Sequence, residues 1–585
     1  MPKTTAADVM IETLSDWGVE VVFGIPGDGI NGVMEALRKR RESIRFVHVR
    51  HEEAAALMAC GYAKYTGKLG VCLGTSGPGG IHLLNGLYDA KLDAKPVLAL
   101  TGLQYHDLIG TQTQQDVELD KLFQDVSVYN ARIMGPAHVR NAMELACRTA
   151  LAEKGVAHVT IPVDIQEMPV DADARSKRNV PRHTSSEFAR GAREPDPADI
   201  KRAAELINAG RSITILVGQG ALEATDEVLK TAEILQAPVV KALLGKAVVP
   251  DDHPYTTGQV GLLGTEASYT AMEACDTLLI VGSGFPYIEY YPKPDQARGV
   301  QIDSDPQRIG LRFPVEVGLA GDSAKALQAL LPLLKRRADS AHLKKCQAQM
   351  QEWRELMQKR GSVDTLPMKP QVVAWELGKR LADNAIVSCD SGTITTWWAR
   401  QIPVKRGQMH SVSGNLATMA CGLPYAIAAQ IAHPERQSIA FVGDGGFSML
   451  MAEFSTAVKY SLPIKVIVIK NNSLGQIKWE QMVINGNPEF GCELENIDYA
   501  AVARACGGAG FTIEDPKNCG AILEEALNTP GPVVVDAVVD PHEPPMPPGV
   551  TLDQVKALAA ALAKGTPSRG RIIKTIAGDR LREMI

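Results

Sequence analysis

The segment 438–480 constrains the fold most, because two apolar runs in it flank one amphipathic stretch. Residues 439–442 (IAFV) predict a buried strand, and residues 464–469 (IKVIVI) predict a second one. Between them, apolar residues recur every three or four positions over 447–460, which predicts a helix that ends before Pro463. Together these elements form a βαβ unit, whose strands are parallel and whose crossover is right-handed.

Two polar side chains follow the predicted strands, Asp444 after the first and Asn471 after the second. In open parallel sheets, ligands bind at the edge formed by the carboxyl ends of the strands. A carboxylate and an amide oxygen suit Mg²⁺, which keeps positions open for phosphate oxygens. Three glycines, Gly443, Gly445 and Gly446, let the backbone approach a ligand closely. The segment therefore predicts a site for magnesium and a diphosphate.

The GDG and Asn-Asn motifs, separated by a complete crossover unit, resemble the signature of thiamine diphosphate enzymes. The resemblance implies thiamine diphosphate and Mg²⁺ as cofactors, with Asp444, the Asn471 side chain and the Ser473 backbone carbonyl as metal ligands. It also implies that Met419 lies between the two coenzyme rings; core packing, the ordinary interpretation for a methionine at a helix start, is the alternative. The residues assigned to the coenzyme by this resemblance are Met419, Thr418, Gly392, Gly443, Asp444, Gly445, Gly446, Asn471, Ser473 and Ile477.

The first domain, residues 1–180, alternates apolar strands with helical patterns and predicts a parallel α/β sheet. Glu52 stands in the first turn of a predicted helix, where an acidic residue either offsets the helix dipole or serves a ligand. The stretch 50–90 resembles the pyrimidine-binding domain of the pyruvate oxidase group. The resemblance implies that Glu52 is the catalytic glutamate, which hydrogen-bonds the aminopyrimidine and drives its tautomerisation. It also places an active-site histidine at His82 and a substrate-side glutamine at Gln115.

Residues 197–335 predict a second α/β domain, which follows an exposed linker at 171–195. The predicted strands 213–217 and 277–281 end in Gly-x-Gly turns, and the strand 300–302 ends in an acidic turn, DSDP. Glycine turns and an acidic strand end together indicate a dinucleotide site. Because the third glycine of that fingerprint is absent, an ordinary structural turn is the alternative.

Three loops of the second domain, GQVGLLG, GSGFPY and QIDSDP, resemble the flavin-binding loops of pyruvate oxidases and quinone-dependent pyruvate dehydrogenases. In those enzymes FAD lies extended over the central domain, so the resemblance implies FAD as a third cofactor. The implied contacts are Val260, Gly261, Leu262, Leu263, Ser283, Gly284, Phe285, Pro286, Tyr287 and Asp303. Some relatives keep this domain without a redox-active flavin, so bound FAD alone would not establish an oxidation.

Residues 365–540 contain the βαβ unit described first and predict a third α/β domain. The chain is therefore predicted to have an α/β fold with three doubly wound parallel-sheet domains and a C-terminal helical tail, residues 541–585. From Arg569 onward, the apolar residues of the tail fall largely on one helical face and basic residues outnumber acidic ones. Such an end either lies on an anionic membrane surface or packs on its own protein. In quinone-dependent pyruvate dehydrogenases, a similar carboxyl terminus reaches the membrane.

Composition argues against several other classes of protein. The net charge of −6 and the pI near 6.1 give no reason to expect a nucleic-acid partner. The start of the chain lacks the basic and apolar runs of a signal peptide, and no apolar stretch reaches the roughly 18 residues of a membrane span. The ten cysteines show no metal-ligand spacing, so we expect reduced thiols in a cytoplasmic protein. Contact of the tail with the inner face of the membrane is the alternative.

The predicted reaction is the oxidative decarboxylation of a 2-oxo acid similar to pyruvate, with electrons passing through FAD to quinone or oxygen. Glu480 favours it, because the oxidases carry a glutamate at this place and the acetolactate synthases carry a tryptophan. Gln114 and Gln476 argue for caution, because the oxidases have phenylalanines at these positions. The alternatives are an acetolactate synthase-like carboligase, a 2-oxo acid decarboxylase with a structural or absent flavin, and an inactive cofactor-binding scaffold.

The two halves of the predicted site, Glu52 and Asp444, lie on different domains that must close over one coenzyme. In the family that the chain resembles, these halves come from different subunits. The resemblance therefore implies a homodimer or homotetramer with active sites between subunits. A small-molecule 2-oxo acid is the other expected partner.

Overall fold

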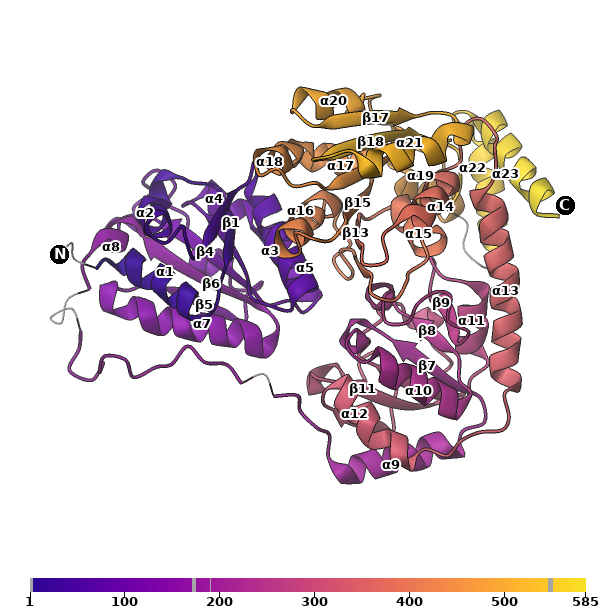
Figure 1. Cartoon of the computed structure of the whole chain (residues 1–585), viewed down its shortest axis with the longest axis horizontal. Helices are drawn as coiled ribbons and strands as arrows, with labels where there is room; N and C mark the ends of the chain where they lie inside the picture. The colour runs from indigo at the N-terminus through magenta and orange to yellow at the C-terminus, as the bar shows by residue number, and fades with distance from the viewer. Residues whose placement is uncertain (1–3, 171–174, 190, 546–550, 585) are drawn as a thin grey trace.

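The computed structural model describes residues 4–170, 175–189, 191–545 and 551–584, with the backbone alone for 579–584. Within these ranges, three six-stranded sheets form three α/β domains, followed by C-terminal helices (Figure 1). Every strand pair in the three sheets is parallel. The predicted fold class, three parallel-sheet α/β domains with a helical tail, is confirmed.

The first sheet has the order β2-β1-β3-β4-β6-β5 and is covered by helices on both faces. Helices α1 (Ala6–Asp16), α2 (Asn31–Lys39) and α7 (Val139–Glu153) bury one face. Helices α3 (Glu52–Thr66) and α5 (Leu84–Leu92) bury the other. The strands are β1 (Val21–Gly24), β2 (Arg45–His48), β3 (Gly70–Gly74), β4 (Val97–Leu103), β5 (Tyr129–Arg132) and β6 (Val156–Pro162).

Helix α3 joins the first domain to the third. Its sequence is rich in alanine, and it is buried along nearly its whole length between the first sheet and α16 (Gly422–Ala432). The two helices approach closely at Gly61, where an added Cβ would lie 2.9 Å from Cδ1 of Tyr425. The helix ends at Gly67, which adopts φ 66°, a conformation that favours glycine. One hydrophobic core therefore runs through both domains.

The second sheet has the order β12-β11-β10-β7-β8-β9, in which the order of strand addition reverses between the parallel neighbours β10 and β7. Such a reversal is the usual place for a ligand in a doubly wound sheet. The predicted strands 213–217 and 277–281 coincide with β7 and β10. The strands are β7 (Ile213–Val217), β8 (Val239–Lys241), β9 (Thr256–Gln259), β10 (Thr277–Val281), β11 (Arg298–Asp303) and β12 (Val317–Ala320).

The helices of the second domain are α9 (Pro197–Ala209), α10 (Thr225–Leu235), α11 (Glu266–Glu273) and α12 (Ser323–Leu330). Helices α9, α10 and α12 bury one face of the sheet, and α11 covers the other. Helix α13 (Ala341–Gly361) then runs along the outside of the second domain to the third (Figure 1). Most of the described linker, 175–189, is exposed or half-buried, as the sequence predicts.

The third sheet has the order β14-β13-β15-β16-β18-β17, which repeats the order of the first sheet. Strands β15 and β16 are parallel neighbours, so the predicted βαβ unit is present. The strands are β13 (Ile386–Cys389), β14 (Met409–Ser411), β15 (Ser438–Gly443), β16 (Lys465–Lys470), β17 (Ala509–Ile513) and β18 (Val533–Val538). Besides α16 and the crossover helix between β15 and β16, the covering helices are α14 (Pro370–Arg380), α15 (Thr393–Gln401), α20 (Tyr499–Ala505) and α21 (Pro516–Asn528).

The crossover helix differs from the prediction of one helix over 447–460. It consists of α17 (Asp444–Leu450), a 3₁₀ turn at Met451–Glu453 and α18 (Phe454–Lys459). The turn brings the buried carboxylate of Glu453 to the first domain, where it accepts hydrogen bonds from the backbone amides of Arg50 (2.7 Å) and His51 (2.9 Å). A contact between domains therefore interrupts a helix that the local pattern favours.

The tail contains α22 (Leu552–Ala563) and α23 (Arg569–Met584), and both pack against α19 (Gly475–Val483) of the third domain. Ile572 and Ala561 are buried there against Trp479 and Met482. Of the two alternatives for the tail, the described side chains show packing on the protein itself, although Ile573 is exposed. The tail side chains Leu581, Met584 and Ile585 lie outside the described part. In the described ranges, no helix combines the length and apolar character needed to cross a bilayer.

Candidate active site

A cavity of about 820 Å³ runs along the carboxyl ends of the strands in the second and third domains. It is lined by every residue that the sequence assigns to a cofactor except Thr418, which precedes the lining residue Met419. These residues come from chain segments far apart in the sequence, at or just after the ends of β9, β10, β11, β13, β14, β15 and β16. The fold therefore brings the two predicted cofactor regions into one continuous space.

The predicted magnesium ligands lie together at the ends of β15 and β16. Asp444 is 3% exposed, and its carboxylate accepts hydrogen bonds from the amides of Asn472 (2.6 Å) and Gly445 (3.0 Å). Burial raises the pKa of Asp444 to about 6, although these amides oppose the rise. Oδ1 of Asn471 accepts from the amide of Ser473 at 3.0 Å, and the Ser473 carbonyl accepts from Gly475. Each oxygen keeps a further lone pair, so the three form an oxygen-only set that fits Mg²⁺.

Two glycines mark where a diphosphate fits. Gly392 follows β13 and Gly443 ends β15, and these strands are neighbours where the strand order of the third sheet reverses. A Cβ added at either glycine would meet no atom within 4 Å, so both backbones face open cavity. Beside them, Asp390 accepts from the amide of Ala420 (3.1 Å), and burial raises the pKa of Asp390 to about 6. The residues present fit a phosphate group coordinated through magnesium.

Met419 lies beside the Asp444 turn, with its Cε 3.2 Å from the position of a Cβ added at Gly445. Its neighbour Thr418 accepts a hydrogen bond from Nδ2 of Asn85 (2.9 Å), which also donates to Glu53 (2.7 Å). The methionine lines the cavity and is absent from the described hydrophobic core clusters. This position favours the coenzyme role over simple core packing.

The second-domain end of the cavity lies where the strand order of its sheet reverses. Gly220 donates from its backbone to the carbonyl of Gly282 (3.0 Å), which joins the turns after β7 and β10. Phe285 and Tyr287 pack edge to face at 5.6 Å, and both line the cavity with Asp303. Burial raises the pKa of Asp303. These turns, an aromatic pair and an acidic strand end fit an extended dinucleotide such as FAD.

The predicted catalytic residues divide into two groups. Glu480 lines the cavity from α19 and accepts a hydrogen bond from Nε2 of Gln476 at 2.9 Å. The other three lie in the first domain and are absent from the residues that line this cavity in the described chain. There Oε2 of Glu52, which is 9% exposed, lies 3.0 Å from Nδ1 of His82. Gln115 accepts from the hydroxyl of Ser76 at 2.7 Å.

The loop 74–80 holds this first-domain group together. A Cβ added at Gly79 would lie 3.4 Å from Oε1 of Glu52, and one added at Gly77 would lie 2.9 Å from Cβ of Gln115. His82 also stacks on His51, with ring centroids 4.6 Å apart. Glu52, His82 and Gln115 are thus gathered at one edge of the first sheet, apart from the cavity residues of the same chain.

Sequence reasoning missed several residues that line the cavity. Lys95 and Lys154 reach it from the first domain, and Gln554 reaches it from the tail. Burial lowers the pKa of Lys95 to about 8, and Lys154 donates to the hydroxyl of Ser304 at 3.2 Å. No motif surrounds these residues, because their place in the cavity follows only from how the domains pack. The two lysines add positive charge to a space that fits phosphorylated cofactors.

The fold and the cavity define an α/β protein whose strand-end residues fit a metal-bound diphosphate. Comparison with known families identifies it further. The three domains match, in order, models of the thiamine pyrophosphate enzyme N-terminal TPP binding domain (residues 4–126), central domain (200–330) and C-terminal TPP binding domain (390–537). The chain belongs to the thiamine pyrophosphate enzyme family.

Full-length relatives support this assignment. The chain is 42% identical over 564 residues, 96% of each chain, to the putative thiamine pyrophosphate-containing protein YdaP of Bacillus subtilis. It is 32% identical to the pyruvate oxidase of Lactiplantibacillus plantarum, over 95% of this chain and 92% of the oxidase. It is 31% identical to a probable acetolactate synthase large subunit of Methanocaldococcus jannaschii, over 94% of each chain. Similar identities to an oxidase and a synthase leave the reaction to be inferred from the site.

Proposed function

We propose that the protein uses thiamine diphosphate, Mg²⁺ and FAD to decarboxylate a 2-oxo acid oxidatively, and that FAD passes the electrons to quinone or oxygen. One observation carries the proposal: a single cavity contains both the Asp444–Asn471 metal site and the dinucleotide-type turns of the second domain. A flavin and a thiamine ring bound there would share one space. The pyruvate oxidase among the relatives covers all three domains and supports the same reaction.

The residues of this chain have distinct roles in the proposed reaction. When bound, thiamine diphosphate supplies a carbon nucleophile that adds to the keto carbon and takes up the electrons released with carbon dioxide. Asp444, Asn471 and Ser473 would hold the diphosphate through Mg²⁺, and Met419 would orient the coenzyme rings. Glu52, a nearly buried carboxylate, would exchange a proton with the aminopyrimidine nitrogen of a bound coenzyme.

His82 contacts Glu52, and Gln115 contacts the same loop, 74–80, that packs against Glu52; we assign both residues to substrate binding. The bond between Glu52 and His82 holds the carboxylate in place and links it to a group that can exchange protons. Glu480 approaches from α19, where Gln476 fixes one of its oxygens. These polar groups bind and orient a small acid and move protons at its keto oxygen.

A non-oxidative carboligase of the acetolactate synthase type is the second candidate. Gln476 favours it, because a polar amide lines the cavity where the oxidases carry a phenylalanine near the flavin. A full-length relative named as a probable acetolactate synthase is almost as similar as the oxidase. In that case the flavin would be structural or absent, and a second 2-oxo acid would be the acceptor.

Flavin absorbance separates the two candidates. We expect the purified protein to contain FAD, and we expect anaerobic addition of a 2-oxo acid such as pyruvate to bleach it. Bleaching must require both thiamine diphosphate and Mg²⁺. Decarboxylation or ligation without bleaching would overturn the oxidative assignment and favour the carboligase. Absence of any turnover together with absence of coenzyme binding would favour the inactive scaffold.

We propose a homodimer or homotetramer in which two chains complete each site. The division of the predicted catalytic residues supports this assembly, because Glu52, His82 and Gln115 lie apart from the cavity of their own chain. A second copy would bring its first-domain group to that cavity. The cytoplasm is the proposed location, with contact between the tail and the inner face of the membrane as a separate hypothesis.

A further inference from the structure

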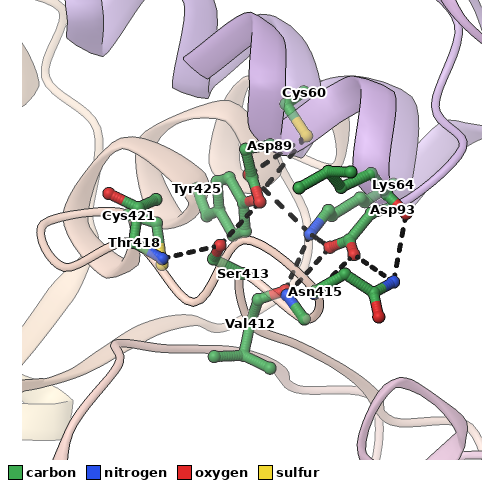
Figure 2. Close-up of polar contacts among 12 residues, drawn as sticks. Cys60, Lys64, Asp89, Asp93, Val412, Ser413, Asn415, Thr418, Cys421 and Tyr425 are labelled. Carbon is green, nitrogen blue, oxygen red and sulfur yellow. Dashed lines mark hydrogen bonds and ion pairs between the residues drawn. The ribbon is translucent and has the colours of Figure 1, made fainter. Parts of the chain in front are cut away.

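A buried charged network lies where the three domains meet, and none of the proposed catalytic steps uses it (Figure 2). Lys64, in the last turn of α3, forms an ion pair with Asp93 at 2.7 Å and lies 3.9 Å from Asp89. The side chain of Lys64 is 3% exposed, and those of Asp89 and Asp93 are fully buried. Burying charges is strongly unfavourable unless partners compensate. The partners of Lys64, Asp89 and Asp93 must therefore compensate for the loss of water around these charges.

The electrostatics indicate that Lys64 remains charged. Burial alone lowers the pKa of Lys64, but the carboxylates of Asp89 and Asp93 outweigh burial and raise it above its usual range. Burial raises the pKa of Asp89. For Asp93, burial is again opposed by Lys64 and by hydrogen bonds, and the pKa falls below its usual range. The Lys64–Asp93 pair is consequently the charged centre of the network.

This pair holds the backbone of the third-domain segment 412–419. Lys64 donates to the carbonyl of Val412 at 2.7 Å. The carboxylate of Asp93 accepts from the backbone amides of Gly414 and Asn415, both at 2.9 Å. Two first-domain side chains thus make three hydrogen bonds to consecutive parts of one loop. The loop cannot shift without breaking bonds to buried charges, which is costly.

Asp89 fixes the far end of segment 412–419. Its Oδ1 accepts from the hydroxyl of Ser413 at 2.7 Å, and its Oδ2 accepts from the hydroxyl of Tyr425. Because a serine hydroxyl has only one proton, the Ser413 oxygen is left as an acceptor, and it accepts from the amide of Thr418 at 3.0 Å. Asp89 therefore fixes, through Ser413, the backbone amide of Thr418, the residue before Met419.

The held segment has a strained backbone that needs such support. Ala417 and Ala420, on either side of Thr418–Met419, adopt φ values of 54° and 70°. Left-handed conformations of residues other than glycine are energetically unfavourable and persist where the surroundings enforce them. Asp390 holds the amide of Ala420 from the third domain, and the network holds the other side of the segment.

The network also reaches the second domain. Nε2 of Gln219, in the turn after β7, donates to the backbone carbonyl of Asp93 at 2.9 Å. A Cβ added at Gly414 would lie 2.5 Å from Cδ1 of Leu244, so the loop packs tightly there too. Asp93 thus contacts all three domains beside the cavity, whose lining includes Ser413, Gly414 and Met419.

We propose that Lys64, Asp89 and Asp93 are positioning residues, which fix segment 412–419 so that Met419 meets the thiamine coenzyme in the bound geometry. This proposal rests on the proposed function, because it requires thiamine diphosphate to bind in the cavity. A network that only joined domains would affect unfolding and leave coenzyme affinity unchanged. The two possibilities therefore predict different measurements.

The principal test is Lys64→Met, which keeps the aliphatic length and removes the charge. Titration of the apoprotein with thiamine diphosphate at saturating Mg²⁺ is expected to show a Kd at least about ten-fold weaker, a change equivalent to roughly 1.4 kcal/mol. At saturating coenzyme, kcat is expected to fall by a smaller factor than the affinity. Lys64→Arg, which keeps the charge, should restore the affinity to within a few-fold of wild type.

The matched control is Lys68→Met, because Lys68 lies just beyond α3 and forms a surface pair with Glu20 at 2.9 Å. We expect it to leave the coenzyme Kd unchanged. Should Lys64→Met fail to fold, Ser413→Ala removes only the hydroxyl that links Asp89 to Thr418, and it is expected to weaken coenzyme binding several-fold without a large change in Tm.

Wild-type coenzyme affinity in folded Lys64→Met or in Ser413→Ala, with only Tm lowered, would overturn the positioning role. Failure of the wild-type chain to bind thiamine diphosphate would instead contradict the proposed function itself.

Discussion

The backbone amide of Asn472 donates to Oδ2 of Asp444 at 2.6 Å and thereby joins the ends of β15 and β16 at the proposed magnesium site. Substitution Asp444→Asn keeps the shape of the side chain and removes the charge that a divalent ion needs. We expect Mg²⁺-dependent binding of thiamine diphosphate to weaken on the order of 100-fold. Equilibrium dialysis with and without Mg²⁺ measures this change. The exposed Asp383 supplies the control, and equal losses in Asp383→Asn and Asp444→Asn would contradict the assignment.

Glu52 is expected to act in catalysis more than in binding. Glu52→Gln keeps a hydrogen-bonding group beside His82 and removes the ability to exchange a proton, so turnover should fall about 100-fold or more. Coenzyme affinity should change only a few-fold. Glu53→Gln is the matched control, because its amide oxygen can still accept from Asn85. If Glu52→Gln turned over substrate at the wild-type rate, its proposed role would be wrong.

Mixing two inactive variants tests whether sites form between chains. In a dimer of Glu52→Gln with Asp444→Asn, one site carries both substitutions and the other carries neither. Random exchange of chains should therefore restore about one quarter of the wild-type activity. If each site were built within one chain, mixing would restore nothing. Subunit exchange followed by an activity assay distinguishes these outcomes, with each unmixed variant as control.

The grouping of the proposed metal ligands could be predicted from the sequence because it depends on local order. Two apolar runs define neighbouring parallel strands, and Asp444 and Asn471 follow them directly. The role of Glu52 could not be derived in this way, since an acidic residue in a first helical turn is common. Its assignment came from the resemblance, and the structure adds that the carboxylate is nearly buried beside His82.

The Lys64–Asp93 pair could not be predicted at all. Charged side chains are expected at the surface, and nothing in their spacing indicates burial. They are buried because α3 packs against α16 of another domain. The broken crossover helix has a similar cause, since Glu453 bonds to the first domain. Interactions between domains, which local patterns do not encode, account for these differences.

From the burial of His158 we predict that the first domain loses stability in acid. The ring of His158 is buried, with Nε2 lying 2.8 Å from the hydroxyl of Thr101 and Nδ1 lying 2.8 Å from Oδ1 of Asn130. Burial lowers the pKa of His158 to about 3. Below pH 6.5 the unfolded chain takes up a proton that the folded chain excludes. The stability contributed by the neutral ring is therefore present above pH 6.5 and is lost as pH falls toward 3. The expected loss from pH 7 to pH 5 is about 2 kcal/mol.

His158→Gln tests this dependence. The variant is expected to be less stable at pH 7, because the stacking of the ring on Phe123 at 4.0 Å is lost. Its Tm should nevertheless fall less than that of the wild type between pH 7 and pH 5. Thermal unfolding at the two pH values gives both quantities, and an equal acid-induced fall in the two proteins would show that His158 does not titrate as described.

Gln476 should limit electron transfer to the flavin in the proposed oxidative reaction. It lines the cavity next to Glu480, where the oxidases that the chain resembles carry a phenylalanine. We expect Gln476→Phe to accelerate flavin reduction in an anaerobic single turnover by about ten-fold, equivalent to lowering the barrier by ~1.4 kcal/mol. Gln476→Leu loses the same hydrogen bond to Glu480 without adding a ring, so it separates the two effects. Equal rates of flavin reduction in the Phe and Leu variants would show that any gain comes from freeing the Glu480 carboxylate. An unchanged rate in Gln476→Phe would show that Gln476 does not limit electron transfer.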